Sequence, residues 1–200
     1  MWMDLIPRIQ GILLKPKDEW EKIKGEDLPV QSLFTSYAMI VAAIPAIAQF
    51  IGNGLIGRSV LSFGWYRRPI GSALLQAVLF YMFSLVTVYV LGIIINALAP
   101  TFSSKQNQNN AMKIAVFSMT AAWVAGIFYI IPFLGVLAIL GALYGFYILY
   151  LGFDASLMDT PKEKVVGYFV VSLVVAFVLY FLISVILGAI FAVGAVGGLY

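Results

Sequence analysis

The chain contains neither cysteine nor histidine. These absences exclude disulfides, thiolate nucleophiles, thiol or imidazole metal sites, haem and iron–sulfur ligation, and a Ser-His-Asp triad. The sequence also lacks a GxxxxGK[ST] motif and a GxGxxG motif that opens a helix after a strand, so nothing in it predicts a phosphate-binding loop. We therefore predict no catalytic residue, no metal ligand and no cofactor.

Charged residues are also scarce. Asp, Glu, Lys and Arg make up 10% of the chain and hydrophobic residues 62%, with a mean hydropathy of +1.00. A soluble domain carries about 25% charged residues, so the deficit predicts an integral membrane protein. The net charge of +3 suits anionic lipid headgroups better than nucleic acid, because no basic run or stacking platform lies outside the apolar segments.

Five apolar runs are long enough to cross a hydrocarbon core of ~30 Å, which takes about 20 helical residues. They predict helices at approximately 33–57, 70–99, 113–131, 133–153 and 162–193. The predicted fold class is an all-α membrane protein, a five-transmembrane-helix bundle with an N-terminal interfacial amphipathic helix. Residues 1–31 form the cytoplasmic or interfacial helical segment, and residues 32–200 form the membrane domain.

Lysine and arginine are unevenly shared between the two sides of this bundle. Because positively charged loops stay in the cytoplasm, we predict a multi-pass protein of the cell inner (plasma) membrane with its N-terminus in the cytoplasm and its C-terminus outside. The cytoplasmic side would hold nine such residues and the outer side three: Arg8, Lys15, Lys17, Lys22, Lys24, Lys105, Lys113, Lys162 and Lys164 against Arg58, Arg67 and Arg68.

The N-terminal segment is amphipathic. Apolar residues recur at roughly helical spacing in residues 2–14, and a narrow apolar stripe runs through the charged stretch 17–24. Two interpretations fit this pattern: a solvated helix that lies against its own protein, and a membrane-surface anchor or partner-docking helix. Tryptophan favours the headgroup level, so we predict interfacial anchors at Trp2, Trp20 and Trp65.

Small residues recur at four-residue spacing in two of the predicted spans. Ala38 and Ala42 lie in the first span, and Gly141 and Gly145 lie in the fourth. Such faces let another helix approach closely, so we predict that these four residues mediate helix packing. The partners that we expect are the lipid bilayer, a second copy of the chain, and an unidentified cytoplasmic or membrane protein.

Residues 149–168 gather charge between the last two apolar runs. Thr160, Pro161 and Glu163 match a capping box, which predicts that the fifth helix starts here. Asp154 stands near the end of the preceding helix, where the helix dipole disfavours a carboxylate. We expect either structural compensation, by a lysine, a tyrosine hydroxyl or water, or a functional contact.

The same stretch supplies the candidate contact residues of the cytoplasmic rim. Three carboxylates in it could accept a hard divalent cation, but capping and solvation of the loop account for Asp159 and Glu163 more simply. The asparagine-rich and glutamine-rich connection at 100–110 predicts a short mobile loop on the same side. We therefore predict partner contacts at Tyr150, Asp154, Asp159 and Lys162.

A series of motifs lies between residues 110 and 170. It comprises a lysine at the start of the third span, an aromatic–serine pair, a tryptophan, a proline turn, a tyrosine-rich fourth span, a Leu-Gly step, and Thr-Pro followed by Gly-Tyr: Lys113, Phe117–Ser118, Trp123, Pro132, Tyr144, Tyr147, Tyr150, Leu151–Gly152, Thr160–Pro161 and Gly167–Tyr168. These motifs resemble those of the Yip-domain membrane proteins, specifically their bacterial branch. The N-terminal KPKDEWEKI is similar to the pre-membrane segment of that family, so the resemblance covers most of the chain.

The resemblance implies five membrane helices and a cytoplasmic N-terminus. Eukaryotic members look like membrane-trafficking factors that associate with Rab-type GTPases and with each other. This chain lacks their long cytoplasmic N-terminal region and their Asp-Leu-Tyr-Gly-Pro-type motif, so the GTPase role is not carried over.

Three functions follow as hypotheses. The first is a non-enzymatic scaffold or membrane-organisation factor of the Yip type. The second is an oligomeric channel or small-solute transporter, although no span carries an ionisable residue near its centre, tyrosine aside, as ion-coupled carriers usually do. The third, a membrane-bound enzyme, is the weakest, because only a few rim carboxylates and tyrosines could act as acid or base.

Overall fold

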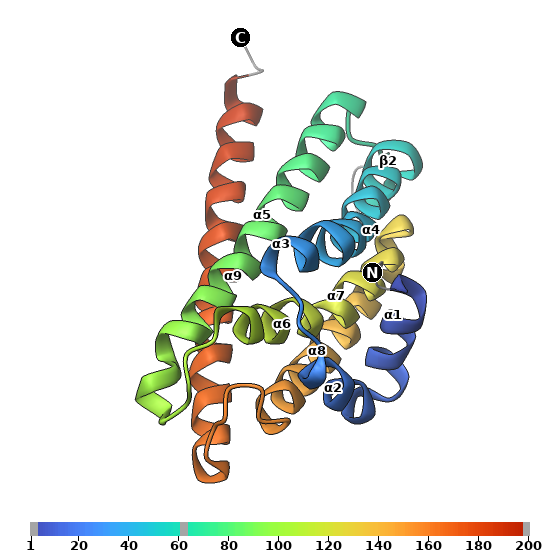
Figure 1. Cartoon of the computed structure of the whole chain (residues 1–200). Helices are drawn as coiled ribbons and strands as arrows, with labels where there is room; N and C mark the ends of the chain where they lie inside the picture. Colours follow the sequence, from blue (N-terminus) through green and yellow to red (C-terminus); the bar gives the residue numbers. More distant parts are fainter. Residues whose placement is uncertain (1–3, 61–63, 198–200) are drawn as a thin grey trace.

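The computed structural model describes residues 4–60 and 64–197 of the chain (Figure 1). Within that part, five helical segments are long and apolar enough to cross a membrane, and a shorter apolar helix precedes them. The predicted all-helical fold class with five spans is confirmed. The five segments are Val30–Ile56, Ile70–Phe102, Gln108–Ile130, Phe133–Asp154 and Lys162–Ile186.

Two short helices come first and form a hairpin. Helix α1 (Leu5–Leu14) ends at Lys15, and α2 (Pro16–Gly25) begins directly after it, with a proline at its first position. Proline suits this position because the first helical N–H has no partner in the helix. The hairpin lies beside the bundle, on the side away from α9 (Figure 1).

The first span is not a uniform α-helix. It passes from α3 (Val30–Leu33) through a π-helical turn (Phe34–Ala38) into α4 (Met39–Phe50), and ends in a second π-helical turn (Ile51–Ile56). Gly57, at φ 83°, stops the helix in a conformation that only glycine adopts readily.

The connection between the first two spans contains two short strands that the sequence did not predict. Strands β1 (Arg58–Val60) and β2 (Gly64–Tyr66) pair antiparallel, with Arg58 opposite Tyr66. The second span follows as α5 (Ile70–Leu98) and closes with a 3-10 turn (Ala99–Phe102). The strands and the α8–α9 turn lie at opposite ends of the molecule (Figure 1).

The third span is broken in the middle. It comprises α6 (Gln108–Ser118), α7 (Thr120–Ala125) and a 3-10 turn (Gly126–Ile130), with the break at Met119. The Ser118 hydroxyl donates to the carbonyl of Ile114 at 2.5 Å, a type of contact that bends helices. All residues from Ala111 to Ser118 are buried, so α6 occupies the centre of the bundle.

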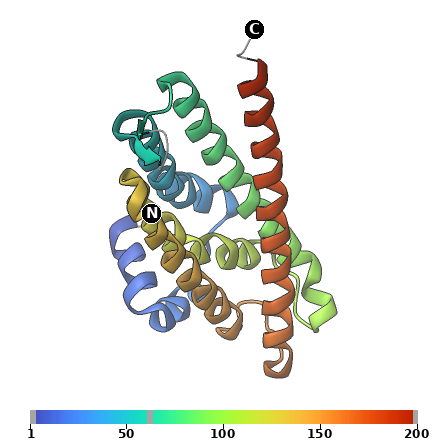
Figure 2. The ribbon, with the colours of Figure 1, turned by 180° about the vertical axis from the view of Figure 1, so that it is seen from behind.

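The last two helices form the remaining wall. A second 3-10 turn (Pro132–Val136) leads into α8 (Leu137–Asp154), which packs against α7 and α6. Helix α9 (Lys162–Gly197) continues beyond the predicted end at residue 193 and lies at the edge of the bundle beside α5 (Figure 2). Only 6% of its apolar stretch is buried, so most of its surface faces outward.

Candidate functional site

The α1–α2 hairpin is docked on the helical bundle through Trp20. This side chain is 1% exposed and packs edge-on against Phe117 of α6, with 6.2 Å between ring centroids. Its indole N–H donates to the carbonyl of Ile148 in α8 at 3.1 Å, and Gly152 on the next turn leaves room for the ring. Of the two interpretations of this segment, the structure matches the helix that lies against its own protein.

Other contacts along the hairpin tighten the same interface. Ile12 and Ile23 are fully buried in the shared core. The Tyr144 hydroxyl of α8 donates to the carbonyl of Leu13 at 2.9 Å. The hairpin is therefore fixed to α6 and α8 by apolar burial and by hydrogen bonds to its backbone.

A group of charged side chains lies inside this interface. Arg8 donates to Glu19 at 2.7 Å and also to Glu26, while Lys22 reaches the other oxygen of Glu19 at 2.9 Å. Arg8 and Glu19 are nearly inaccessible, at 10% and 7% side-chain exposure. The Arg8 guanidinium also lies 5.7 Å from the centroid of the Phe117 ring, a cation–π distance. Arg8 and Glu19 are thus paired and shielded where α1 meets α2 and α6, whereas Lys22 stays exposed at the edge of the interface.

Lys113 extends this group from the bundle side. Its side chain is buried in α6, and its ammonium donates to the carbonyl of Ile23 at 3.1 Å and to the carbonyl of Glu26. These carbonyls belong to the C-terminal end of α2, where the helix dipole favours a cation. From the sequence, Arg8 was interpreted only as a charge that sets the topology, and Lys113 as such a charge and as a family motif, but neither was predicted to be a buried contact. The signal that could have found them is that each stands alone in an apolar helical run.

The predicted rim residues lie together where α8 meets α9. Asp154, Asp159 and Lys162 are exposed, and Tyr150 is half-buried with its ring against Phe169. Lys105, from the connection before α6, forms an ion pair with Asp159 at 2.8 Å. We call Lys105, Asp154, Asp159 and Lys162 the charged rim.

The charged rim rests on two connections that are hydrogen-bonded to each other. Ser104 donates to Thr160 at 2.9 Å, the Lys105 backbone N–H donates to Met158 at 2.8 Å, and the Asn110 side chain donates to Leu157 at 2.7 Å. The Thr160 hydroxyl, which the sequence predicts as the cap of α9, accepts the hydrogen bond from Ser104. The connection predicted as a mobile loop is held along its length by these contacts.

Two groups of the charged rim perturb each other. The hydrogen bond and the charge of Lys105 hold the pKa of the Asp159 carboxyl below its usual value, and the same contact raises the pKa of Lys105. Asp154 is exposed, and within the described residues the structure gives its carboxylate no ion pair. Among these residues no lysine therefore compensates the carboxylate at the end of α8, and a functional contact of Asp154 stays a prediction.

The remaining predicted residues have separate places. Trp20 is buried, so it cannot act as the headgroup anchor that its sequence context suggested. Trp2 and the side chain of Trp65 lie outside the described part.

The residues predicted to mediate helix packing lie inside the bundle. Ala38 and Ala42 are fully buried. Gly141 meets Ala121 and Ala125 of α7, and Gly145 lies against the Ser118 carbonyl of α6. Across residues 4–60 and 64–197, no cluster of three or more His, Cys, Asp or Glu could hold a metal ion.

Comparison with known proteins places the chain in a family. Residues 11–186 match the Yip1 domain. The inner membrane protein YohC of Escherichia coli strain K12 is 28% identical over 164 residues, which cover 78% of this chain and 81% of YohC, and YohC of Escherichia coli O6:H1 strain CFT073 gives the same values. No solved structure matches the chain significantly. Because the matched region spans most of the chain, this protein belongs to the Yip1 domain family.

Proposed function

We propose that this protein is a non-enzymatic inner-membrane protein that acts as a scaffold in membrane organisation, with a partner that docks on the charged rim. The two relatives are inner membrane proteins by name, which supports the location. The excess of lysine and arginine on the side of α1 and the charged rim supports a cytoplasmic N-terminus and a C-terminus outside.

The observation that carries the proposal is the filled centre of the bundle. Helix α6 lies there and is buried on all sides from Ala111 to Ser118. The two polar side chains of this buried stretch, Lys113 and Ser118, donate to backbone carbonyls of the protein. Transport needs a polar path, so a packed central helix favours a role at the surface of the protein over one through it.

The charged rim is suited to a protein partner. It presents charges of both signs on connections that are cross-linked by hydrogen bonds, so a partner would meet a preformed surface. The lack of cysteine and histidine further supports a role without catalysis.

The test uses a photo-crosslinking amino acid at position 150, beside the charged rim, in the full chain in cells. We expect a crosslinked product of one defined mass that Asp154→Arg or Lys162→Glu abolishes. Lys17→Glu is the matched control, because Lys17 is also exposed but lies on α2. A crosslink that survives both rim variants, or no crosslink at all, contradicts the proposal.

Flux into proteoliposomes tests the alternative function, an oligomeric channel or small-solute transporter. The scaffold proposal expects no solute flux above that of empty liposomes. Flux that Asp154→Asn alters would replace the scaffold proposal with the transport function.

A further inference from the structure

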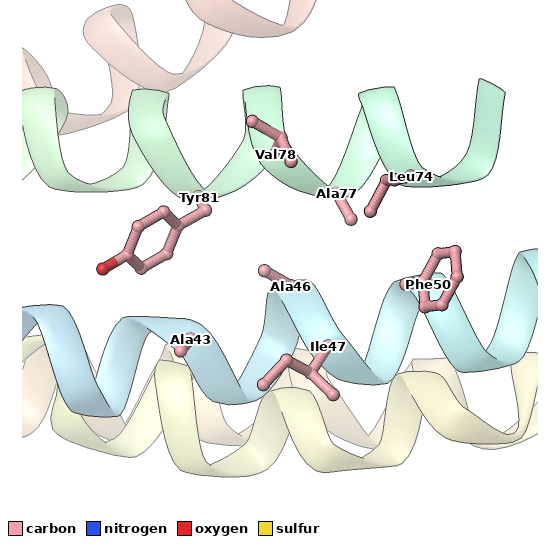
Figure 3. A pocket seen from close by; sticks show the side chains of 8 residues that line it. All are labelled: Ala43, Ala46, Ile47, Phe50, Leu74, Ala77, Val78 and Tyr81. Atoms are coloured by element: carbon pink, nitrogen blue, oxygen red, sulfur yellow. The ribbon is translucent and has the colours of Figure 1, made fainter. Parts of the chain in front are cut away.

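An apolar groove runs between the first two spans. It has a volume of about 260 Å³ and is lined only by apolar surface of α4 and α5 (Figure 3). Phe50 and Leu74 stand at one end, and Ala43 and Tyr81 stand at the other. The Tyr81 hydroxyl donates to the carbonyl of Met39 at 3.1 Å and bridges the two helices at that end. The remaining lining residues are Ala46, Ile47, Ala77 and Val78.

The dimensions of the groove fit a stretch of hydrocarbon chain. Residues 43–50 and 74–81 line it, which corresponds to roughly 10 Å along each helix. One leaflet contributes about half of a ~30 Å hydrocarbon core, so the groove covers most of one leaflet. A dry apolar cavity of about 150 Å³ is enough to hold benzene, and the larger groove accommodates a longer apolar group.

Two arginines precede α5 at the end of the groove where Phe50 and Leu74 stand. Arg67 is exposed and Arg68 half-buried, immediately before α5 begins at Ile70. The Arg68 backbone N–H donates to the carbonyl of Asn53 at 3.0 Å, which holds this connection over the end of the first span. Leu74 lies four residues into α5, or roughly 6 Å along it. A headgroup layer is roughly 5–8 Å thick, so the arginines lie at headgroup level when the groove lies in the hydrocarbon.

The first two spans and their connection carry no acidic residue in the sequence. All nine Asp and Glu residues lie within residues 4–27 and 154–163, so none occurs between 28 and 153. The cations that connect the first two spans are all arginines, Arg58, Arg67 and Arg68, whereas eight of the nine cations elsewhere are lysines. Arginine binds phosphate through two parallel hydrogen bonds, which lysine cannot do.

From the groove and the arginines together, we propose a binding site for an anionic phospholipid. Its phosphate contacts Arg67 and Arg68, and one of its acyl chains lies in the groove between α4 and α5. The site is independent of the charged rim and of the proposed scaffold function, because it lies at the opposite end of the bundle.

The test is native mass spectrometry of the full chain from nanodiscs that contain equal parts of phosphatidylglycerol and phosphatidylethanolamine. We expect the wild type to retain phosphatidylglycerol preferentially. Arg67→Gln with Arg68→Gln should lower that preference roughly thirtyfold, the fold-change that corresponds to removing two basic side chains from an anionic surface. Lys17→Gln with Lys24→Gln is the control, because it removes the same charge from exposed positions on α2.

A second pair of variants tests the groove. Val78→Phe fills it and should reduce the retention of both lipids, while Val86→Phe should not. The two valines lie on the same helix with exposures of 49% and 52%, but only Val78 lines the groove. The proposed site is wrong if the arginine and lysine double variants lower the preference for phosphatidylglycerol equally. It is also wrong if Val78→Phe and Val86→Phe reduce lipid retention equally. A dimer that Val78→Phe dissociates overturns the site as well, because a second copy would then occupy the groove.

Discussion

Replacement of Trp20 by alanine should release the N-terminal hairpin from the bundle. The indole is almost fully buried between α6 and α8 and donates one hydrogen bond to Ile148. Large aromatic truncations in a core cost about 3–5 kcal/mol, and a single hydrogen bond contributes about 1 kcal/mol. The lost contacts all join the hairpin to the bundle. The substitution therefore lowers the free energy of local opening of the hairpin rather than that of global unfolding. About 3 kcal/mol raises the open population roughly a hundredfold.

Hydrogen–deuterium exchange in nanodiscs measures this opening. Amides of α1 and α2 should exchange much faster in Trp20→Ala, whereas those of α6 keep most of their protection. Trp20→Phe should lie between Trp20→Ala and the wild type, since it keeps most of the packing and loses the indole N–H. Unchanged protection of residues 5–25 in Trp20→Ala would refute the reasoning, because it would mean that lipid holds the hairpin.

Gly152→Ala tests the same contact from the other side. An added Cβ would lie 2.8 Å from the Cζ2 atom of Trp20, and the rigid ring would have to move. We expect destabilisation of the hairpin by about 1–3 kcal/mol, as for an overpacked core. Gly71→Ala in α5 is the matched control, because nothing lies within 4 Å of its added Cβ. Equal exchange in the two variants would contradict the tight contact.

Three further predictions concern charge and hydrogen bonding. Arg8→Gln should destabilise the hairpin by about 3 kcal/mol, because the buried Glu19 carboxylate loses its guanidinium, and adding Glu19→Gln should recover part of the loss in a double-mutant exchange cycle. The pKa of Asp159 is lowered in the folded protein, so this carboxylate contributes stability at pH values above the ordinary aspartate pKa. That contribution is lost as the pH falls through the lowered pKa. An NMR titration should find the ordinary pKa restored in Lys105→Gln. Tyr168→Phe should lower stability by about 1 kcal/mol in thermal unfolding, because the buried hydroxyl donates to a carbonyl of α5.

Each of these predictions has a result that contradicts it. Strict additivity of Arg8→Gln and Glu19→Gln would mean that the two side chains are not coupled. An Asp159 titration that does not respond to Lys105→Gln would place the cause of its lowered pKa elsewhere. A Tyr168→Phe variant as stable as the wild type would show that the hydroxyl exchanges its carbonyl for another partner without loss.

Hydropathy was enough to predict the five spans, because each needs about 20 apolar residues whatever its neighbours are. The break at Met119 was not predictable in this way, since neither glycine nor proline stands there. Contacts with another span surround the break: Thr120, directly after it, shares a 2.8 Å hydrogen bond with Tyr37 of the first span. The π-helical turns at Phe34–Ala38 and Ile51–Ile56 likewise have no local sequence signature that we could use.

The candidate site was predictable only where it is local. The rim residues of the α8–α9 connection are close in sequence, so their proximity in the structure was predictable, while their contact with a partner stays a prediction. Trp20 was predicted as an interfacial anchor, whereas the structure buries it against a partner, Ile148, that lies 128 positions away in the sequence. Apolar residues on an amphipathic helix fit a lipid surface and a protein groove equally well, and only the position of α6 and α8 decides between them.

The docking of the hairpin has a consequence for the order of assembly. Trp20, Leu13 and Ile23 emerge first during synthesis, but the residues that bind them, Ile148, Tyr144 and Lys113, follow 90 to 131 positions later. At about 5–20 residues per second, the hairpin waits on the order of ten seconds with its tryptophan and isoleucines uncovered. The bilayer surface is the apolar environment nearest to a chain in the course of insertion. We therefore expect lipid to cover this hairpin first and the completed bundle to replace it.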